Sequence, residues 1–251
     1  LCLSKDYWQG PCLRCDPCRR MLAATNAIKG HCRMPDDIKD SLRILLLGCM
    51  SSGKSTVLNA LLGKGVFPAG NRATTAQVFT IVHDPHCKEN ICRNPSEGED
   101  WHPLSLERLA GYNGAMRANT PAEVRLRLPH LERKRSIVFY DTPGPNTSKF
   151  GEHRQETYFA LEKLPVTHIF LVLDMVQLHT RDEDALLADM GRVVEQRGSL
   201  PVLVLLNKAD VIDIDKESIA AIIDDARSTV AAHLPTAAAC STPLGISGKA
   251  P

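Results

Sequence analysis

The feature that most constrains this chain is a glycine-rich octapeptide between an apolar run and an amphipathic segment. Residues 42–47 form the apolar run, as expected of a buried parallel strand, and residues 54–62 have the pattern of a helix. Between them lies Gly48-Cys49-Met50-Ser51-Ser52-Gly53-Lys54-Ser55. Such a loop can surround phosphate oxygens with backbone N–H groups, because glycine allows the tight backbone path and the helix adds its positive end. The octapeptide therefore predicts a phosphate-binding P-loop within an α/β fold.

Two side chains of this loop have specific predicted roles. We expect Lys54 to reach the β- and γ-phosphates of a nucleotide and the Ser55 hydroxyl to bind Mg²⁺. The other residues predicted to line the nucleotide are Gly48, Cys49, Met50, Ser51, Ser52, Gly53 and Thr56. A glycine-rich turn that matches by chance is the alternative, and the strand before it and the helix after it argue against that reading.

Two later motifs have the properties of γ-phosphate sensors. Thr75 ends a segment rich in Gly, Pro and Asn that can close over the phosphate and offer a hydroxyl to Mg²⁺, with Thr74 as an adjacent competitor. Asp141-Thr142-Pro143-Gly144 follows a strand, so that Asp141 can contact Mg²⁺ through water and the Gly144 N–H can meet the γ-phosphate. Considered alone, the second motif is an ordinary turn with proline at its second position.

The motif Asn207-Lys208-Ala209-Asp210 follows a third apolar strand and identifies the base. The Asp210 carboxylate can accept hydrogen bonds from N1–H and the exocyclic amine of guanine, whereas adenine offers no such pair of donors. Asn207 would tie the loop to the P-loop, and the aliphatic part of Lys208 would cover the base. A weaker element is Ile246-Ser247-Gly248-Lys249, in which Ser247 and Gly248 suit a backbone contact with guanine O6, although such short sequences are common.

These residues and their surroundings resemble the dynamin superfamily of large GTPases. The resemblance covers about residues 41–250 and also rests on two neighbouring stretches, Ser55-Thr56-Val57-Leu58-Asn59-Ala60-Leu61-Leu62-Gly63 and Phe67-Pro68-Ala69-Gly70. Two further stretches look most like bacterial dynamin-like proteins, with the replication-clamp-binding GTPase of enterobacteria as the nearest in type: Asp141-Thr142-Pro143-Gly144-Pro145-Asn146 and Leu173-Asp174-Met175-Val176-Gln177-Leu178.

The resemblance implies hydrolysis of GTP to GDP with Mg²⁺ and nucleotide-dependent pairing of GTPase domains. It assigns catalysis to Ser51, Lys54, Thr75 and Gly144, and metal binding to Ser55, Thr75 and Asp141. One departure is Met50, since many dynamins carry Gln there to order the attacking water, and a thioether cannot form that hydrogen bond. We therefore expect slow intrinsic hydrolysis. A GTP-dependent recruitment switch with little hydrolysis is the alternative.

Charge and cysteine content indicate the compartment and the partners. The 30 basic and 29 acidic residues give a net charge of +1, which provides no general attraction to nucleic acid, and no direct nucleic-acid partner is expected. Nine scattered cysteines favour reduced thiols in the cytoplasm. The longest apolar stretch, 169–176, is interrupted by Asp174, so no membrane span is predicted. For the full-length protein, the resemblance implies peripheral membrane association or a partner in the replication machinery.

Outside the motifs, the chain divides into a Cys-rich segment, 1–40, and a dynamin-type GTPase domain, 41–251. The spacing of Cys12, Cys15, Cys18 and Cys32 can hold a structural Zn²⁺, and the alternative is a cysteine-rich tail without metal. We expect the chain to be a piece of a longer protein, with its GTPase domain incomplete at the C-terminal end.

The hydrophobic pattern predicts alternating strands and helices, which favours a mostly parallel central sheet flanked by helices. Strands are expected at 42–47, 77–83, 124–128, 137–140, 168–173 and 202–206, and helices at 54–62, 153–164, 183–196 and 216–233. Residues 83–120 have the composition of an insertion with one short helix near 104–112. We interpret His83, His86, Cys87 and Cys92 within it as parts of a solvated loop rather than as a metal site.

Overall fold

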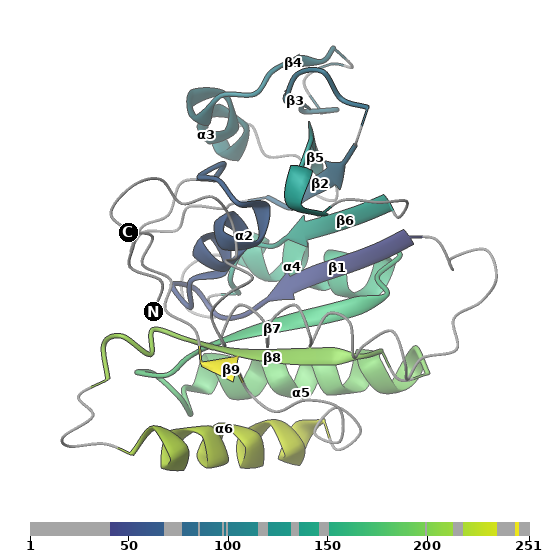
Figure 1. Ribbon diagram of the computed structural model, residues 1–251. Helices are drawn as coiled ribbons and strands as arrows, with labels where there is room; N and C mark the ends of the chain where they lie inside the picture. The colour runs from purple at the N-terminus through teal and green to yellow at the C-terminus, as the bar shows by residue number, and fades with distance from the viewer. Residues whose placement is uncertain are drawn as a thin grey trace.

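The computed structural model describes residues 41–67, 77–84, 86–96, 98, 100–114, 120–131, 136–145, 151–198, 200–212, 218–234 and 244–245. In this part of the chain, nine strands form one sheet in the order β4-β3-β5-β2-β6-β1-β7-β8-β9 (Figure 1). The strands are β1 (Ser41–Leu47), β2 (Phe79–His83), β3 (Ile91–Arg93), β4 (His102–Pro103), β5 (Ala122–Leu126), β6 (Ser136–Asp141), β7 (His168–Asp174), β8 (Val202–Asn207) and β9 (Leu244–Gly245). The helices are α2 (Lys54–Leu62), α3 (Leu106–Gly114), α4 (Gly151–Lys163), α5 (Arg181–Gln196) and α6 (Ile219–His233), with a 3₁₀ turn at Pro129–Leu131.

The centre of the sheet is parallel, as the alternation of strands and helices predicts. β1 lies between β6 and β7, and β7 pairs with β8, all in parallel register. Parallel pairing brings the carboxyl ends of these strands to one edge, where open α/β sheets bind their ligands. β2 runs antiparallel to β6, and β3 runs antiparallel to both β4 and β5.

Helices cover both faces of the sheet, and the strand residues alternate between them. In β1, Leu45 and Leu47 pack into the cluster that also contains residues of α4, α5 and α6. Ile44 and Leu46 point to the opposite face, in the cluster that contains residues of α2 and α3. This period of two follows from the pleat of a strand, and burial on both sides explains why β1, β7 and β8 read as continuous apolar runs. The result is a three-layer α/β fold.

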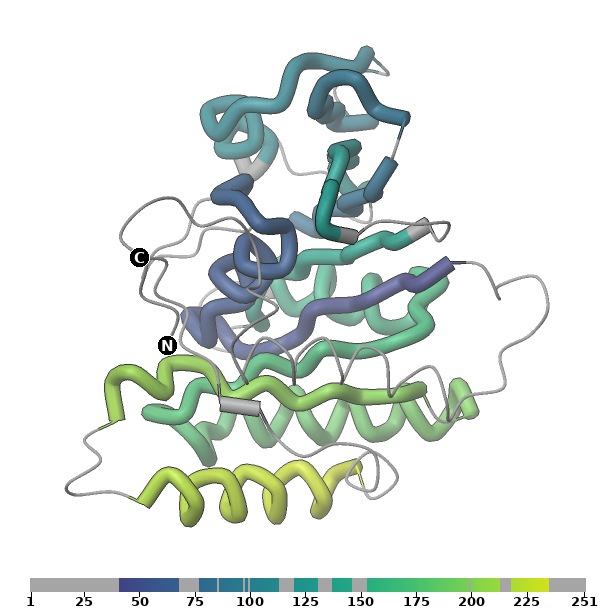
Figure 2. The backbone as a smooth tube through the Cα atoms, in the orientation of Figure 1, coloured from purple at the N-terminus to yellow at the C-terminus, as the bar shows by residue number. Residues whose placement is uncertain are grey.

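The segment that the composition suggested to be a loop-rich insertion contributes secondary structure to one end of the sheet. Figure 2 shows β3, β4 and α3 gathered at the end of the sheet opposite α5 and α6. Our interpretation of this segment as solvated is wrong for His83 and Cys92, which are 5% and 0% exposed. His83 accepts a hydrogen bond through Nδ1 from the Leu128 N–H, and Cys92 packs beside Tyr112. Single residues hidden between turn-forming neighbours left no periodic signal in the sequence.

Other boundaries agree closely with the expectations. α2 begins and ends at the predicted residues, whereas β5 lies two residues before the predicted strand 124–128. In the described residues, no helix is both long enough and apolar enough to cross a membrane.

The contact between α5 and α6 gives a test of the packing. A Cβ added to Gly191 of α5 would lie 2.4 Å from the carbonyl oxygen of His233 at the end of α6. We expect Gly191→Ala to lower the free energy of unfolding by about 1–3 kcal/mol, because the two helices must separate. Urea denaturation followed by circular dichroism measures the change.

Gly111→Ala is the matched control, since Gly111 also lies in a helix but has no neighbouring atom within 4 Å of the added Cβ. This control should keep or slightly raise stability, because alanine is the better helix former. Equal stability of the Gly191→Ala variant and the original chain would contradict the close α5–α6 packing.

Candidate nucleotide-binding site

The P-loop leaves β1 and enters α2 as predicted, and its backbone path requires glycine at Gly53. This residue has a φ of 93°, and a Cβ there would lie 2.0 Å from the side-chain nitrogen of Asn207. Ser51 also adopts a left-handed conformation, with a φ of 64°. Residues other than glycine rarely occupy this region, and such strain is concentrated at functional sites. The loop is therefore held in an unusual shape by contacts from a distant strand.

Lys54 lies beneath this loop and is 7% exposed. Its Nζ donates hydrogen bonds to the carbonyl oxygens of Gly48, at 2.9 Å, and Cys49, at 3.0 Å. Burial lowers the pKa of Lys54, while the nearby Asp141 carboxylate raises it. A buried cation that faces two carbonyls and a carboxylate is well placed to receive phosphate oxygens.

The 141–144 turn packs directly against the P-loop. Asp141, at the end of β6, is fully buried and lies opposite Leu46 of β1 in the sheet register. The Thr142 hydroxyl donates to the Leu46 carbonyl at 2.7 Å and fixes the start of the turn. A Cβ on Gly144 would lie 2.5 Å from the Met50 nitrogen, so only glycine fits between the turn and the P-loop. The two predicted phosphate-binding motifs are therefore adjacent in space.

The 207–210 motif reaches the same edge through β8. The Asn207 side chain, 2% exposed, donates from Nδ2 to the Ser52 carbonyl oxygen at 2.9 Å. This contact is the expected tie between the 207–210 motif and the P-loop. Lys208 has a φ of 66°, and Asp210 lies exposed in the following turn. The carboxylate proposed to read the base can thus be reached by a ligand from solvent.

Asp174 is a site residue that sequence reasoning did not identify. It ends β7 opposite Asn207 of β8, and its Oδ2 lies 2.5 Å from the Lys208 Nζ. Its other carboxylate oxygen accepts the Val176 N–H at 3.0 Å. Asp174 therefore positions the lysine whose aliphatic part is expected to cover the base. The only sequence signal was a charged residue at the end of a buried strand.

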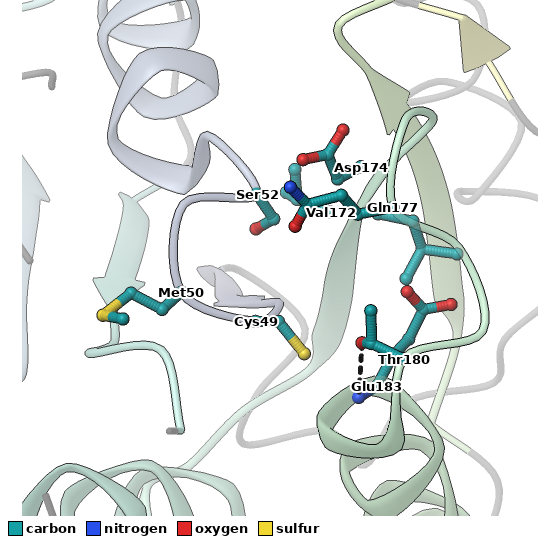
Figure 3. A pocket seen from close by; sticks show the side chains of 9 residues that line it. Cys49, Met50, Ser52, Val172, Asp174, Gln177, Thr180 and Glu183 are labelled. Atoms are coloured by element: carbon teal, nitrogen blue, oxygen red, sulfur yellow. Dashed lines mark hydrogen bonds between the residues drawn. The ribbon is translucent and has the colours of Figure 1, made fainter. Parts of the chain in front are cut away.

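A small cavity of about 20 Å³ lies between the P-loop, the end of β7 and the start of α5. Figure 3 shows the Cys49 sulfur directed toward Thr180 and Glu183, while the Met50 side chain points away from the cavity. Thr180 caps α5 because its hydroxyl accepts the Glu183 N–H. Glu183 is 3% exposed, and its Oε1 has no hydrogen-bond partner among the residues that the structure describes. Burial raises the pKa of Glu183 to about 7 and that of the Cys49 thiol to about 12.

Several predicted site residues lie outside the described part of the chain. They are Thr75 with its competitor Thr74, the guanine-contacting Ser247 and Gly248, and the cysteines Cys12, Cys15, Cys18 and Cys32. Of the P-loop residues, Ser55 is buried and Thr56 is half-buried in the first turn of α2. Among the described residues, no group of three or more His, Cys, Asp or Glu side chains forms a metal-binding cluster.

The donors near the phosphate position suit a magnesium ion. The Ser55 hydroxyl and the Asp141 carboxylate provide hard oxygen ligands, and Mg²⁺ usually takes few protein ligands because it keeps several waters. Both residues are buried, and Asp141 is near enough to Lys54 to influence its pKa. The residues present therefore fit Mg²⁺ bound together with a nucleotide phosphate.

Comparisons with known proteins agree with this arrangement. The model of the family described as the Dynamin family matches residues 44–209. Dynamin-1-like protein of Danio rerio is 22% identical over 205 residues, covering 70% of this chain and 29% of that protein. Dynamin-like protein 2 of Campylobacter jejuni is 25% identical over 181 residues, covering 70% of this chain and 27% of that protein. The chain thus spans under a third of the length of these two relatives.

A solved structure supports the fold. An oligomerised bacterial dynamin pair, described as sensing and tethering membranes over long range, aligns with a TM-score of 0.59. The alignment has 15% sequence identity and covers 92% of this chain and 38% of that one. At this identity the similarity establishes a shared fold.

The buried carboxyl of Glu183 predicts a specific pH dependence of stability. Its pKa in the folded chain, about 7, is above the ordinary 4.5, so folding favours the protonated form. This contribution is fully present below about pH 4.5 and is lost as the pH rises through about 7. We expect Glu183→Gln to remove it, so that the variant gains stability relative to the original chain between these values.

The measurement is urea unfolding of both chains at several pH values, with the difference taken at each pH. Taking the difference in stability between the two chains removes the effect of His168, which is present in both. Burial lowers the pKa of His168 to about 4, so its contribution to stability changes with pH in the opposite direction. A stability difference that does not change between pH 4.5 and 7 would contradict the raised pKa.

Proposed function

We propose that this chain, which belongs to the dynamin family of GTPases, binds GTP with Mg²⁺ and hydrolyses it to GDP and phosphate. The observation that carries the proposal is the hydrogen bond from Asn207 to the Ser52 carbonyl. It joins the predicted guanine-reading strand to the predicted phosphate-binding loop. A chain that merely contained both motifs by chance would have no reason to place them in contact.

The proposed reaction is an in-line attack of water on the γ-phosphorus. The bond from the γ-phosphorus to the bridging oxygen breaks, and its electron pair goes to the β-phosphate of GDP. The proton that the water loses passes to an oxygen of the released phosphate or to solvent. Lys54 and the Gly144 N–H stabilise the negative charge on the phosphates, with Ser51 and Thr75 completing the catalytic set. Ser55 and Thr75 would hold Mg²⁺, with Asp141 contacting it through water, and the bound ion would supply positive charge for the phosphates. Asp174 holds Lys208 beside the base while Asp210 accepts the guanine N–H groups.

Finer features of the proposal concern the organisation of the chain and its partners. We assign residues 41–251 to the GTPase domain and residues 1–40 to a separate segment, where Cys12, Cys15, Cys18 and Cys32 bind Zn²⁺; metal analysis of the purified chain tests this. By its resemblance to dynamins, the GTPase domain associates with a second copy when nucleotide is bound. In the cytoplasm, the full protein acts peripherally at a membrane or with the replication machinery. Analytical ultracentrifugation with and without GTP tests the self-association.

Exchange of Asp210 tests the base assignment. The Asp210→Asn variant loses one acceptor and gains an amide donor, which suits the carbonyl that xanthine carries in place of the guanine amine. We expect GTP affinity to fall by roughly a hundredfold and xanthosine triphosphate affinity to rise. Titration of fluorescent GTP, ATP and xanthosine triphosphate measures both changes.

Lys54→Ala is the companion variant, and it should lose affinity for every triphosphate because it lacks the phosphate-binding amine. ATP binding as tight as GTP binding in the original chain would overturn the role of Asp210. Absence of any triphosphate binding would overturn the proposed function itself.

Met50 distinguishes hydrolysis from the alternative, a GTP-dependent recruitment switch. A glutamine at this position can hydrogen-bond to the attacking water, whereas methionine cannot. We expect Met50→Gln to raise the single-turnover hydrolysis rate by about tenfold or more with little change in GTP affinity. The control is Met50→Leu, which should keep the original rate.

Phosphate release after rapid mixing measures each rate. Hydrolysis that is already fast in the original chain, and is unchanged by glutamine, would contradict the assignment of slow turnover to Met50.

A further inference from the structure

A second cavity, of about 170 Å³, lies far from the nucleotide site. It is formed where β3 ends, beside β4 and α3, and is lined by Asn94, Gly98, Asp100, His102, Arg108 and Tyr112. β4 and β3 occupy one end of the sheet order, whereas β8, which carries the guanine-reading motif, lies near the other. Figure 1 shows this separation, with α3 and β4 at one end and β8 and α6 at the other. The cavity therefore needs an explanation of its own.

Asn94 supplies the observation that points to a ligand. Its side chain is buried, with the residue 3% exposed, and it lines the cavity. Oδ1 accepts hydrogen bonds from the Ser96 N–H at 3.2 Å and the Ser96 hydroxyl at 2.7 Å. These two contacts fix which way the amide faces, and they leave the Nδ2 donor without a partner among the described residues. A buried donor without an acceptor is costly, and an acceptor supplied by a ligand would remove that cost.

Two charged residues of opposite sign lie on different walls of the cavity. Arg108 belongs to α3, whereas Asp100 precedes β4, and both are exposed. Neither forms an ion pair with another residue of the described ranges. By contrast, the neighbouring Arg93 is engaged by Glu123 at 2.9 Å and stacks on Trp101. Arg108 and Asp100 are thus available for a molecule that carries both signs.

We propose that this cavity binds a small zwitterion of the amino-acid type. The carboxylate of the ligand accepts hydrogen bonds from Arg108 and from the Asn94 Nδ2, and its ammonium group pairs with Asp100. Arginine matches a carboxylate well because its guanidinium can donate two parallel hydrogen bonds. The volume suits such a molecule, since a cavity of about 150 Å³ holds a ligand the size of benzene.

Trp101 provides a probe of the site. It lies between the cavity residues Asp100 and His102, and the guanidinium carbons of Arg93 and Arg125 stack 4.6 and 4.5 Å from its ring centroid. The chain has two tryptophans, so a Trp8→Phe background leaves Trp101 as the only one. We would titrate this variant at constant ionic strength with L-alanine, L-leucine and L-glutamine, and then with the deaminated and decarboxylated analogues of the tightest ligand. The side-chain amide resonance of Asn94 gives a second, direct readout.

The expected result is saturable binding of at least one amino acid, with a shift of the Asn94 amide resonance. Arg108→Gln and Asn94→Asp should each weaken binding by about tenfold or more, because each removes a donor to the carboxylate. Asp100→Asn should instead remove the preference for the zwitterion over its deaminated analogue. The matched control is Arg127→Gln, which changes an exposed arginine that does not line the cavity.

Two outcomes would overturn the proposal. One is the absence of saturation with every amino acid by both readouts, in chains that unfold cooperatively. The other is a response that is equal for sodium chloride, or equally weakened by Arg127→Gln, since either would indicate unspecific charge screening. Saturable binding of the deaminated analogue alone, unaffected by Asp100→Asn, would contradict the zwitterion and leave a carboxylate site instead. Because GTP binding is measured separately, failure here does not affect the proposed GTPase activity.

Discussion

The hydrogen bond from Asn207 to the Ser52 carbonyl is the contact on which the geometry of the nucleotide site depends. It connects residues separated by 155 positions in the sequence. The Asn207 side chain also lies so close to Gly53 that a Cβ on Gly53 would collide with it. The contact forms only because β8 ends at the same sheet edge as β1. That alignment comes from β7, which pairs in parallel with both strands and whose Asp174 lies opposite Asn207. The buried apolar residues of these three strands therefore stabilise the site as well as the core.

Electrostatics at this edge favour a polyanionic ligand. Lys54 is buried, which is costly for a cation unless acceptors surround it, and here two P-loop carbonyls and the nearby Asp141 reduce that cost. The positive end of α2 points into the same loop. On the other side of the P-loop, burial favours the protonated form of Glu183. The raised pKa reduces the negative charge that Glu183 places beside the P-loop, and so it reduces the repulsion of an anion bound there.

The sequence predicted those parts of the structure that depend on short-range patterns. The residues of α2 and the positions of the P-loop, the 141–144 turn and the 207–210 motif follow from local periodicity and glycine placement. The role of Asp174 depends on strand register, and that register is a long-range property that one sequence does not reveal. The burial of Cys92 was also not predictable. It lies in β3, and a strand of three residues is too short to produce an alternating pattern. Asn94 became a candidate only when its two contacts with Ser96 showed which of its side-chain atoms lacks a partner in the described part of the chain.

In the P-loop, the backbone path and the side chain of Met50 depend on different contacts. A Cβ added to Gly144 would lie 2.5 Å from the backbone nitrogen of Met50 and 2.6 Å from its Cα. The contact therefore depends on the absence of a side chain at residue 144, and the side chain of Met50 does not take part in it. The Met50 side chain points away from the cavity beside Cys49 and Glu183 (Figure 3). The loop can therefore keep its path whether residue 50 carries a hydrogen-bonding side chain or a thioether. Because backbone contacts and glycines fix the shape of the loop, a change at this one side chain can alter the proposed hydrolysis while the proposed nucleotide binding is retained.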